Sequence, residues 1–428
     1  MTQASRLSCE IMAGKYDYVF SSLYGPGGDA ARQRERYARA IGAFGESYGP
    51  GRRVSVYSVP GRVELCGNHT DHNNGIVMAA AVDLDIIAVA SKSCRDEIRL
   101  RSKGFSGEHA VSLSTLQPRD SEAGSPSAII RGVAQGFCAY GGRIGGFDAY
   151  VDSDVLKGSG LSSSAAFEVC VGTVLNEEFN GRRFDAVTLG IIGQFAENRY
   201  FGKPSGLMDQ VTCASGGAIS IDLKDPSAPV VEKVPLDLAS YGMNLVVTDT
   251  KGDHSGLTDE YAAIRGEMES VARYFGKPCL REVPYDDFLG AVARVRDAAG
   301  DRATLRALHF FEECGRVREA IDALGRGDMR GFLSIIAESG NSSFEYNQNA
   351  YSARDSGHQG IPVALALSQV TLRERGAWRL QGGGFAGTIQ AFVPDDLLDG
   401  YRALMRSVFG DDACHTLQVR ASGGVKVC

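Results

Sequence analysis

Apolar and polar residues alternate at two places in the first half of the chain, with the period of two that is typical of a half-buried strand. Val54 and Val56 begin the first of these stretches, and Phe147 and Val151 belong to the second. Between them, an almost continuous apolar run predicts a long strand over residues 76–90. Shorter strands are predicted near residues 98–100, 111–113, 218–223, 244–248 and 388–393.

Helical spacing of apolar residues fills most of the sequence between these strands. Tyr37, Ile41 and Phe44 form an apolar stripe near the end of a polar stretch that runs to about Tyr48. We therefore expect a helical extension packed on the outside of the protein. Further helices are predicted over residues 128–139, 186–200, 259–275 and 363–375. Another is predicted to begin at residue 165, and residues 304–336 are predicted to form a helical hairpin.

The length of the chain predicts more than one domain, because 428 residues are many for a single hydrophobic core. Polarity rises and prolines gather between residues 225 and 235, which favours a boundary there. The sequence thus predicts a helical N-terminal extension over 1–48, an N-terminal domain over 49–230 and a C-terminal domain over 231–428.

The composition, 43% hydrophobic and 23% charged, is that of an ordinary globular protein. A net charge of -7 argues against nucleic acid as a partner, because nucleic-acid binders need a basic face. The sequence has no apolar run long enough to span a membrane, and its ten cysteines are scattered without a Cys-x-x-Cys pair. We expect a cytoplasmic enzyme with buried, reduced thiols and no membrane partner.

A run of glycine and serine lies between the strand that contains Val151 and the helix predicted from residue 165. Glycines permit a tight turn close to a ligand, and the free N–H groups of a helix start attract anions. The run therefore predicts a phosphate-binding loop, although it lacks the lysine of the P-loop motif and a serine-capped helix is the alternative. Its residues are Gly158, Ser159, Gly160, Leu161, Ser162, Ser163, Ser164 and Ala165.

Polar residues are also dense between the first two strands, where Arg62, Asn68, His69 and Asp71 lie within ten positions. Such a cluster is ill suited to a hydrophobic core and well suited to a pocket that binds several hydroxyl groups. The alternative is a hydrogen-bonded loop that ends in the turn Asn74-Gly75.

Two single acids are further candidates. Glu197 lies in the helix predicted over 186–200, and Asp209 follows Gly206 among apolar residues. A carboxylate in apolar surroundings needs a partner, although Asp209 could also cap a helix.

A second glycine-rich segment contains Gly382, Gly383, Gly384 and Gly387. A dinucleotide-binding motif must open a helix, whereas here an alternating strand follows, so that interpretation fails. We expect these glycines to form a wall beside the phosphate-binding loop, with a plain hairpin turn as the alternative.

In this order, the motifs resemble those of the GHMP small-molecule kinases, and within them the galactokinases. The resemblance covers most of residues 50–393: the polar cluster from Pro60, the loop before Ala166, Gly206 to Gln210, and Gly382 to Thr388. It implies an α+β, two-domain GHMP kinase fold with the active site in the cleft between the domains. The N-terminal domain would be ribosomal protein S5 domain 2-like and the C-terminal domain ferredoxin-like.

The resemblance also implies an activity, the transfer of the γ-phosphate of ATP to the anomeric hydroxyl of galactose to give galactose 1-phosphate. Asp209 would face that hydroxyl as a base or an electrostatic anchor, with Arg62 beside it and the transferring phosphate. Ser164 and Glu197 would hold Mg²⁺. The residues implied around the sugar are Asn68, His69, Asp71, Gly206 and Tyr261.

Two positions depart from the family pattern, since galactokinases carry Glu where this chain has Asn68 and Tyr where it has His72. An amide can donate as well as accept hydrogen bonds. One alternative is therefore an anomeric kinase of another hexose, such as a C6-altered sugar like galacturonate. Another is a non-catalytic sugar sensor that controls a partner. No segment gives a specific sign of such a partner, and we expect a monomer.

Overall fold

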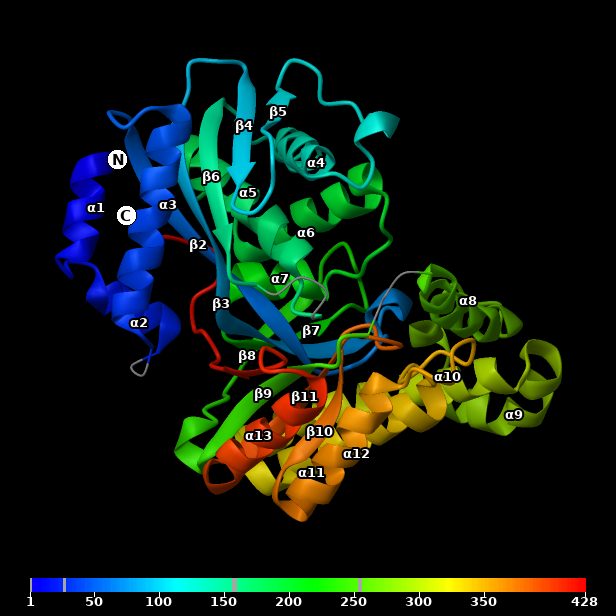
Figure 1. Ribbon diagram of the computed structural model, residues 1–428. Coiled ribbons are helices and arrows are strands. Elements are labelled where there is room, and N and C mark those ends of the chain that lie inside the picture. Colours follow the sequence, from blue (N-terminus) through cyan, green and yellow to red (C-terminus); the bar gives the residue numbers. More distant parts are fainter. Residues whose placement is uncertain (1, 26–27, 156–159, 253–255) are drawn as a thin grey trace.

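The computed structural model describes residues 2–25, 28–155, 160–252 and 256–428. Within these residues the chain forms one sheet of nine strands and one of four, and helices cover both (Figure 1). The larger sheet comes from the first half of the chain, except that its strand β13 is the last element before the C-terminus. The two marked ends of the chain consequently lie near each other, beside helices α1 and α3.

The two long strands of the larger sheet, β2 and β3, carry apolar side chains on both faces. On β3, Ile86 and Ala88 belong to one core, whereas Ile87 and Val89 belong to another. Because successive residues of a strand point to opposite faces, both sides of this sheet must be covered. The order is β1-β2-β3-β6-β4-β5, with β13 on β2, β7 on β3 and β8 on β7. The strands are β1 (Thr2–Gln3), β2 (Arg53–Cys66), β3 (Ile76–Lys92), β4 (Glu97–Ser102), β5 (His109–Ser112), β6 (Phe147–Ser153), β7 (Ala218–Asp222), β8 (Val230–Val234) and β13 (Val425–Lys426).

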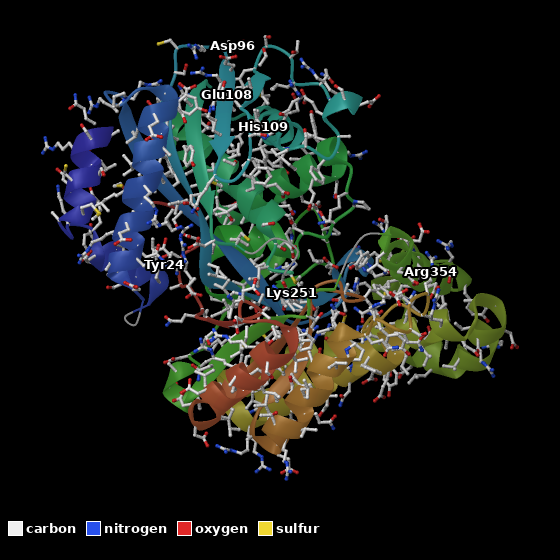
Figure 2. All side chains as sticks on the ribbon, viewed as in Figure 1. Tyr24, Asp96, Glu108, His109, Lys251 and Arg354 are labelled. Atoms are coloured by element: carbon white, nitrogen blue, oxygen red, sulfur yellow. The ribbon has the colours of Figure 1, made fainter. Side chains whose placement is uncertain are left out.

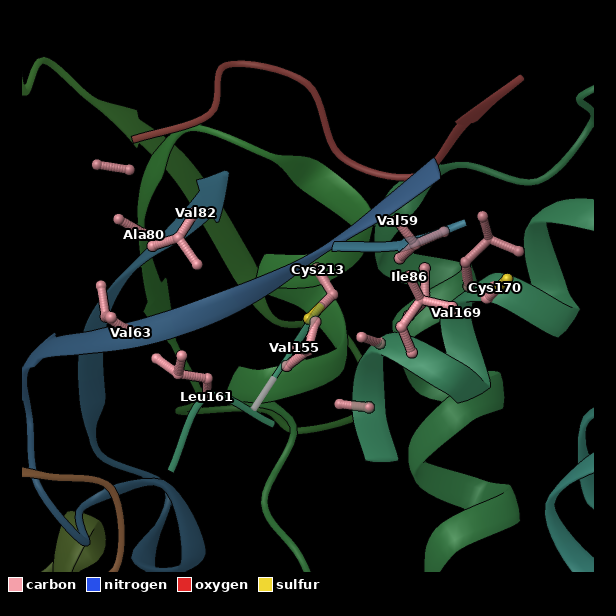
Figure 3. Packing of buried hydrophobic residues seen from close by; sticks show 14 of the residues in the cluster. Val59, Val63, Ala80, Val82, Ile86, Val155, Leu161, Val169, Cys170 and Cys213 are labelled. Atoms are coloured by element: carbon pink, nitrogen blue, oxygen red, sulfur yellow. The ribbon is translucent and has the colours of Figure 1, made fainter. Parts of the chain in front are cut away.

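Four helices cover one face of this sheet: α4 (Pro126–Ala139), α5 (Ser163–Asn180), α6 (Ala186–Ala196) and α7 (Met208–Ser215). Side chains cap two of them, since Ser125 accepts from the N–H of Ala128 and Asp185 accepts from that of Thr188. Buried Val59, Val155, Leu161, Val169 and Cys213 pack in the same core (Figure 3). The start of α5 is therefore anchored to the sheet.

The opposite face is covered by α1 (Ala4–Met12), α2 (Asp17–Tyr24) and α3 (Ala30–Tyr48). A buried carboxylate, Asp85, ties these helices to the sheet. Its oxygens accept hydrogen bonds from Arg36 of α3 at 2.6 Å and from Tyr24 of α2 at 2.7 Å (Tyr24 is labelled in Figure 2). Arg420, close to the C-terminus, approaches it to 3.3 Å. Three helices thus lie where the sequence predicts a helical extension, and they pack on the larger sheet.

The smaller sheet has the order β10-β11-β9-β12, all antiparallel. Helix α11 packs on one face, and α12 and α13 pack on the other. The strands are β9 (Met243–Asp249), β10 (Ala377–Gln381), β11 (Thr388–Pro394) and β12 (Cys414–Leu417). The helices of this half are α8 (Thr258–Tyr274), α9 (Tyr285–Ala299), α10 (Asp301–Gly325), α11 (Met329–Ser342), α12 (Gly360–Leu372) and α13 (Leu398–Phe409).

Several elements differ from the sequence-based expectation. Strand β2 continues to Cys66, so Arg62 lies on a strand and not in a loop. Helices α9 and α13 and strands β12 and β13 were not predicted. Strand β8 pairs with β7 in the larger sheet at the position where the domain boundary was placed, and the division into domains stays a prediction.

The ten cysteines are all unpaired, as expected, but only six of them are buried. Cys9, Cys94 and Cys138 are exposed and Cys428 is half-buried, so the expectation of buried thiols is wrong for these residues. In the part of the chain that the structure describes, none of the helices has the length and apolar character needed to cross a membrane.

We expect Asp85→Ala to lower the free energy of unfolding by about 3–5 kcal/mol, because it leaves the buried guanidiniums of Arg36 and Arg420 without their carboxylate. Urea unfolding followed by circular dichroism measures this loss. Asp396→Ala is the control, since Asp396 pairs with Arg375 at the surface and its removal should leave unfolding unchanged. Equal stability of the two variants would contradict the importance of Asp85.

Candidate active site

An ion pair between Arg62 of β2 and Asp209 of α7 lies at the centre of the candidate site. The guanidinium donates two parallel hydrogen bonds, from Nε to Oδ1 at 2.7 Å and from Nη2 to Oδ2 at 2.6 Å. Such a two-pronged contact fixes orientation as well as distance. Arg62 is buried, whereas 27% of the Asp209 side chain is exposed, so the carboxylate keeps an open side for a ligand.

A break in the register of β2 brings Arg62 to this position. The pairing of β2 with β3 shifts between Pro60 and Arg62, as in a β-bulge that re-aims a side chain. The N–H of Arg62 then donates to the carbonyl of Leu161 at 3.2 Å instead of to β3. A side chain at Gly61 would meet that carbonyl at 2.9 Å. Glycine at position 61 therefore allows the serine-rich loop to approach the strand.

The described part of the serine-rich loop begins at Gly160, so the predicted phosphate contacts of Gly158 and Ser159 lie outside the described residues. Leu161 is fully buried in the core, as Figure 3 shows. Ser162 has a left-handed backbone, with φ of 58°, which is costly for a residue other than glycine. This conformation lets its hydroxyl donate to Asp209.

Helix α5 begins at Ser163, and the unpaired N–H groups of its first turn face the region before it. This start of a helix, which includes Ser164 and Ala165, has the polarity needed to bind an anion. The predicted position of the loop between strand β6 and a helix is thus confirmed for the residues that the structure describes.

Glu197, on a π-helical turn that follows α6, lies next to the same helix start. Its Oε1 accepts a hydrogen bond from Ser164 at 3.1 Å and one from Lys203 at 3.2 Å. Its Oε2 accepts from Gln210 at 2.9 Å and also from Ser205. The structure therefore brings together the two residues predicted to hold a metal ion.

Gln210 also donates to a second buried carboxyl group, Glu168, at 2.9 Å. Burial and the neighbouring Glu197 raise the pKa of Glu168 well above its usual value. These surroundings therefore favour the protonated form of Glu168 over the charged form.

The two aspartates of the site have opposite pKa shifts. Burial alone would raise the pKa of Asp209, but the charge of Arg62 and hydrogen bonds from Arg62 and Ser162 hold it below its usual value. Burial, together with the charges of Asp209 and Glu64, raises the pKa of Asp71 to about 7. Asp209 is thus ionised at neutral pH, while Asp71 is close to half-protonated.

The residues predicted around a sugar gather beside this pair. A side chain at Gly206 would meet Oδ2 of Asp71 at 1.6 Å, so glycine allows these segments to touch. His69 Nε2 lies 2.9 Å from the carbonyl of Gly383, and the hydroxyl of Tyr261 donates to Gly384 at 2.9 Å. One wall of the pocket is therefore the turn between β10 and β11.

Asn68 lies deeper than the other predicted sugar contacts and is 1% exposed. Its amide group donates to Glu64 at 2.9 Å and to the carbonyl of Gly382 at 2.8 Å. Its carbonyl accepts from Asn349 at 2.9 Å, and Arg379 pairs with the same Glu64 oxygen at 2.7 Å. Asn68 therefore joins strand β2 to the glycine-rich turn through bonds to other protein groups.

The glycine-rich segment is a hairpin turn between β10 and β11, as the alternative interpretation had it, and its role as a wall of the site stays a prediction. Gly382, Gly383 and Gly384 accept hydrogen bonds from residues of the pocket, as described above. The carbonyl oxygen of Gly387 instead accepts a hydrogen bond, at 2.7 Å, from the hydroxyl of Thr250, the residue that follows β9. Gly387 thus bonds to the segment that follows β9 rather than to the residues predicted around the sugar.

A cavity of about 940 Å³ opens from the start of α5, and no sequence motif indicated it. Apolar side chains line its inner part, among them Ile129, Phe167 and Phe201. Ser163 and Ser164 line the edge next to Glu197, and residues of α13 and β12 line the far side. Its walls come from elements distant in sequence, so only the fold could reveal it.

Comparison with known proteins agrees with this geometry. Residues 42–92 match the galactokinase galactose-binding signature, and residues 128–217 match the N-terminal domain of GHMP kinases. A galactokinase of Streptomyces coelicolor is 33% identical over 88% of this chain and 94% of its own length. The chain belongs to the galactokinase family.

Other members and neighbours extend the comparison. A galactokinase of Actinobacillus pleuropneumoniae is 30% identical over 85% of this chain and 91% of its own. The crystal structure of Lactococcus lactis galactokinase complexed with galactose has a TM-score of 0.77 at 24% identity, covering 90% of this chain and 98% of that one. Methanococcus jannaschii mevalonate kinase matches with a TM-score of 0.60 at 13% identity, over 86% and 98% of the chains. The expected α+β GHMP kinase fold is confirmed, and the chain is a sugar kinase that uses ATP.

Lys203 lies in none of the galactokinase-family motifs, and the sequence analysis did not predict it as a site residue. The serine-rich loop contains no lysine of the P-loop kind, but this ammonium group reaches Glu197 from the segment that follows the π-helical turn. Its sequence signal, a lysine before Pro204 in a short connection, is common at protein surfaces and pointed to no function.

The raised pKa of Asp71 makes a prediction about stability. Between pH 4 and 7 the folded protein holds a proton on Asp71 that the unfolded chain, with a pKa of 3.8, has released. The wild type should therefore lose about 1 kcal/mol or more of stability relative to Asp71→Asn between pH 5 and pH 8. Urea unfolding at both pH values measures this difference. Asp399→Asn, at the protein surface, is the control, and parallel pH profiles for wild type and Asp71→Asn would refute the assignment.

Proposed function

We propose that this protein transfers the γ-phosphate of ATP to the anomeric hydroxyl of galactose, giving galactose 1-phosphate and ADP. The observation that carries the proposal is the ion pair of Arg62 and Asp209 beside the start of α5. It puts an ionised acid, a fixed positive charge and an anion-binding helix start within one site. Phosphoryl transfer needs mainly positioning and charge stabilisation of this kind.

In the proposed mechanism, Asp209 binds the anomeric hydroxyl and orients its oxygen towards the γ-phosphorus. As the new O–P bond forms and the bond to the β-γ bridging oxygen breaks, Asp209 accepts the hydroxyl proton. Arg62 keeps Asp209 ionised until then and stabilises the negative charge on the transferring group. The lowered pKa of Asp209 makes it a weak base, so positioning and electrostatics are its larger contribution.

The cavity next to Ser163 and Ser164 is our proposed nucleotide site. Its apolar inner part, with Ile129 and Phe167, suits the flat face of an adenine ring, and its edge at the start of α5 suits the phosphates. A volume of about 940 Å³ is sufficient for a nucleotide.

We propose that Ser164 and Glu197 hold Mg²⁺. Their oxygens lie 3.1 Å apart, and both are the hard donors that this ion prefers. The described residues contain no cluster of three or more His, Cys, Asp or Glu side chains suited to a metal. A two-residue site nevertheless fits Mg²⁺, which keeps several waters and binds substrate phosphates. When bound, the ion would neutralise charge on those phosphates.

Galactose is the sugar that the site supports best. The relatives carry the name galactokinase, and the structural neighbour from Lactococcus lactis is described as a complex with galactose. Asn68 is the argument for a C6-altered sugar, but its hydrogen bonds go to other protein groups, and the carboxylate of Glu64 lies 2.9 Å from its amide. An acidic sugar at this place would meet like charge.

We expect Asp209→Ala to lower kcat by about 10²–10⁴-fold, because it removes the group that orients and deprotonates the hydroxyl. A coupled assay of galactose-dependent ADP release measures kcat, and calorimetry measures galactose binding. Asp411→Ala, which changes an exposed acid, is the matched control. Turnover by Asp209→Ala at the rate of the control would refute the role of Asp209. A wild type that has no kinase activity but keeps a regulatory output would favour the alternative of a non-catalytic sugar sensor.

A panel of hexoses tests the choice of sugar. We expect kcat/KM for galactose to exceed that for galacturonate by about tenfold or more, because Glu64 and Asp209 repel a second carboxylate. The same ADP-release assay gives both values. An equal or higher kcat/KM for galacturonate would show instead that Asn68 shifts the preference towards C6-altered sugars.

A further inference from the structure

Two arginines that line the 940 Å³ cavity have no anionic partner among the described residues. Arg402 and Arg406 are four residues apart on α13, so they share one face of that helix. In the part of the chain that the structure describes, neither guanidinium makes a hydrogen bond or an ion pair. Like charges at this spacing repel each other.

Buried polar atoms point to the same place. The Nε atoms of Arg402 and Arg406 and the hydroxyl oxygen of Thr416 are inaccessible to solvent, and among the described residues they have no hydrogen-bond partner. Thr416 belongs to β12, which lines the cavity next to α13. Buried donors are almost always satisfied in folded proteins, so three of them around one cavity indicate a missing ligand.

Apart from Asp83, whose pKa burial raises to about 6, the other charged side chains that line this cavity are already in ion pairs. Asp154 accepts from Arg32 at 2.7 Å and lies 3.4 Å from Arg36. Lys103 donates to Asp152 at 2.8 Å, and Asp83 accepts from the backbone N–H of Gln418 at 2.9 Å. The unbalanced charge of the cavity is therefore the positive charge on α13.

We propose that Arg402, Arg406 and Thr416 form an anion subsite whose ligand is a phosphate group. Guanidinium groups match the geometry of phosphate oxygens, and a hydroxyl can add one more donor. The choice of phosphate over carboxylate rests on the proposed function, since both the nucleotide and the sugar product of that reaction carry phosphates. The group belongs either to the tail of the nucleotide in the same cavity or to a second phosphorylated molecule.

Calorimetric titration of three probes, ADP, adenosine and inorganic phosphate, tests the subsite and separates its two sources. The probes are titrated into wild type and into the double variant Arg402→Gln/Arg406→Gln. Arg402→Lys/Arg406→Lys keeps the charge, and Arg330→Gln, on the exposed side of α11, is the matched control. Thermal unfolding of each variant checks that it is folded.

If the nucleotide supplies the phosphate, the glutamine pair should weaken ADP binding by about tenfold or more and leave adenosine binding unchanged. If a second molecule supplies it, ADP binding should be unchanged. Wild type saturated with ADP should then bind inorganic phosphate, and the glutamine pair should lose that binding. In both cases the lysine pair should recover part of the affinity, because it retains the positive charge.

Equal binding of ADP and of phosphate by wild type and the glutamine pair would overturn the subsite. An equal loss of ADP and adenosine binding in the glutamine pair would also overturn the subsite, because it would indicate a damaged cavity. A loss of ADP binding of the same size in Arg330→Gln would overturn it as well. Galactose-dependent ADP release by the wild type, measured in parallel, keeps the two proposals apart. An active wild type with an unaffected glutamine pair refutes only the subsite, whereas an inactive wild type refutes only the proposed kinase function.

Discussion

The contact between Arg62 and Asp209 is the constraint on which the rest of the site depends. A guanidinium and a carboxylate that are largely withdrawn from water stabilise each other only if their geometry is nearly ideal. Strand β2 and helix α7 are 147 positions apart at these residues, so the fold must hold both in register. This alignment requires the bulge in β2, the glycine at position 61 and the strained backbone of Ser162, each of which lowers stability locally.

Three carboxyl groups of this site have pKa values shifted in different ways. Arg62 holds the pKa of Asp209 below its usual value, burial and the charge of Asp209 raise the pKa of Asp71 to about 7, and burial beside Glu197 raises the pKa of Glu168 well above its usual value. Environments that push acid pKa values apart are how one pocket provides both an ionised group and neutral donors. An ionised Asp209 and a partly protonated Asp71 can then bind neighbouring hydroxyls of a sugar in different ways.

The sequence predicted the elements whose pattern is local and missed those that depend on the fold. Arg62, Asp209 and Ser164 were found because each lies in a short motif, whereas the role of Glu197 came from the family resemblance. The structure brings Arg62 to Asp209 and Ser164 to Glu197. Asn68 was expected to contact sugar, but the fold surrounds it with Glu64, Gly382 and Asn349. Lys203 and the large cavity left no signal, because ordinary surface residues become neighbours only after both sheets have formed. Helix α13 did carry an amphipathic pattern, with Tyr401 and Met405 buried four residues apart, and the prediction missed it.

This difference also separates the serine-rich loop from a P-loop, whose motif lysine it lacks. A P-loop concentrates backbone donors and a cation in a few consecutive residues, so a motif reveals it. In our proposal the helix start of α5 would supply backbone donors, while the arginines of α13 would supply positive charge from a separate part of the chain. In the proposed subsite, a phosphate would be bound by residues from separate parts of the fold, since α5, α13 and β12 all line the one cavity. Charge distributed in this way is a property of the fold, and substitutions in α13 can change phosphate binding without touching any family motif.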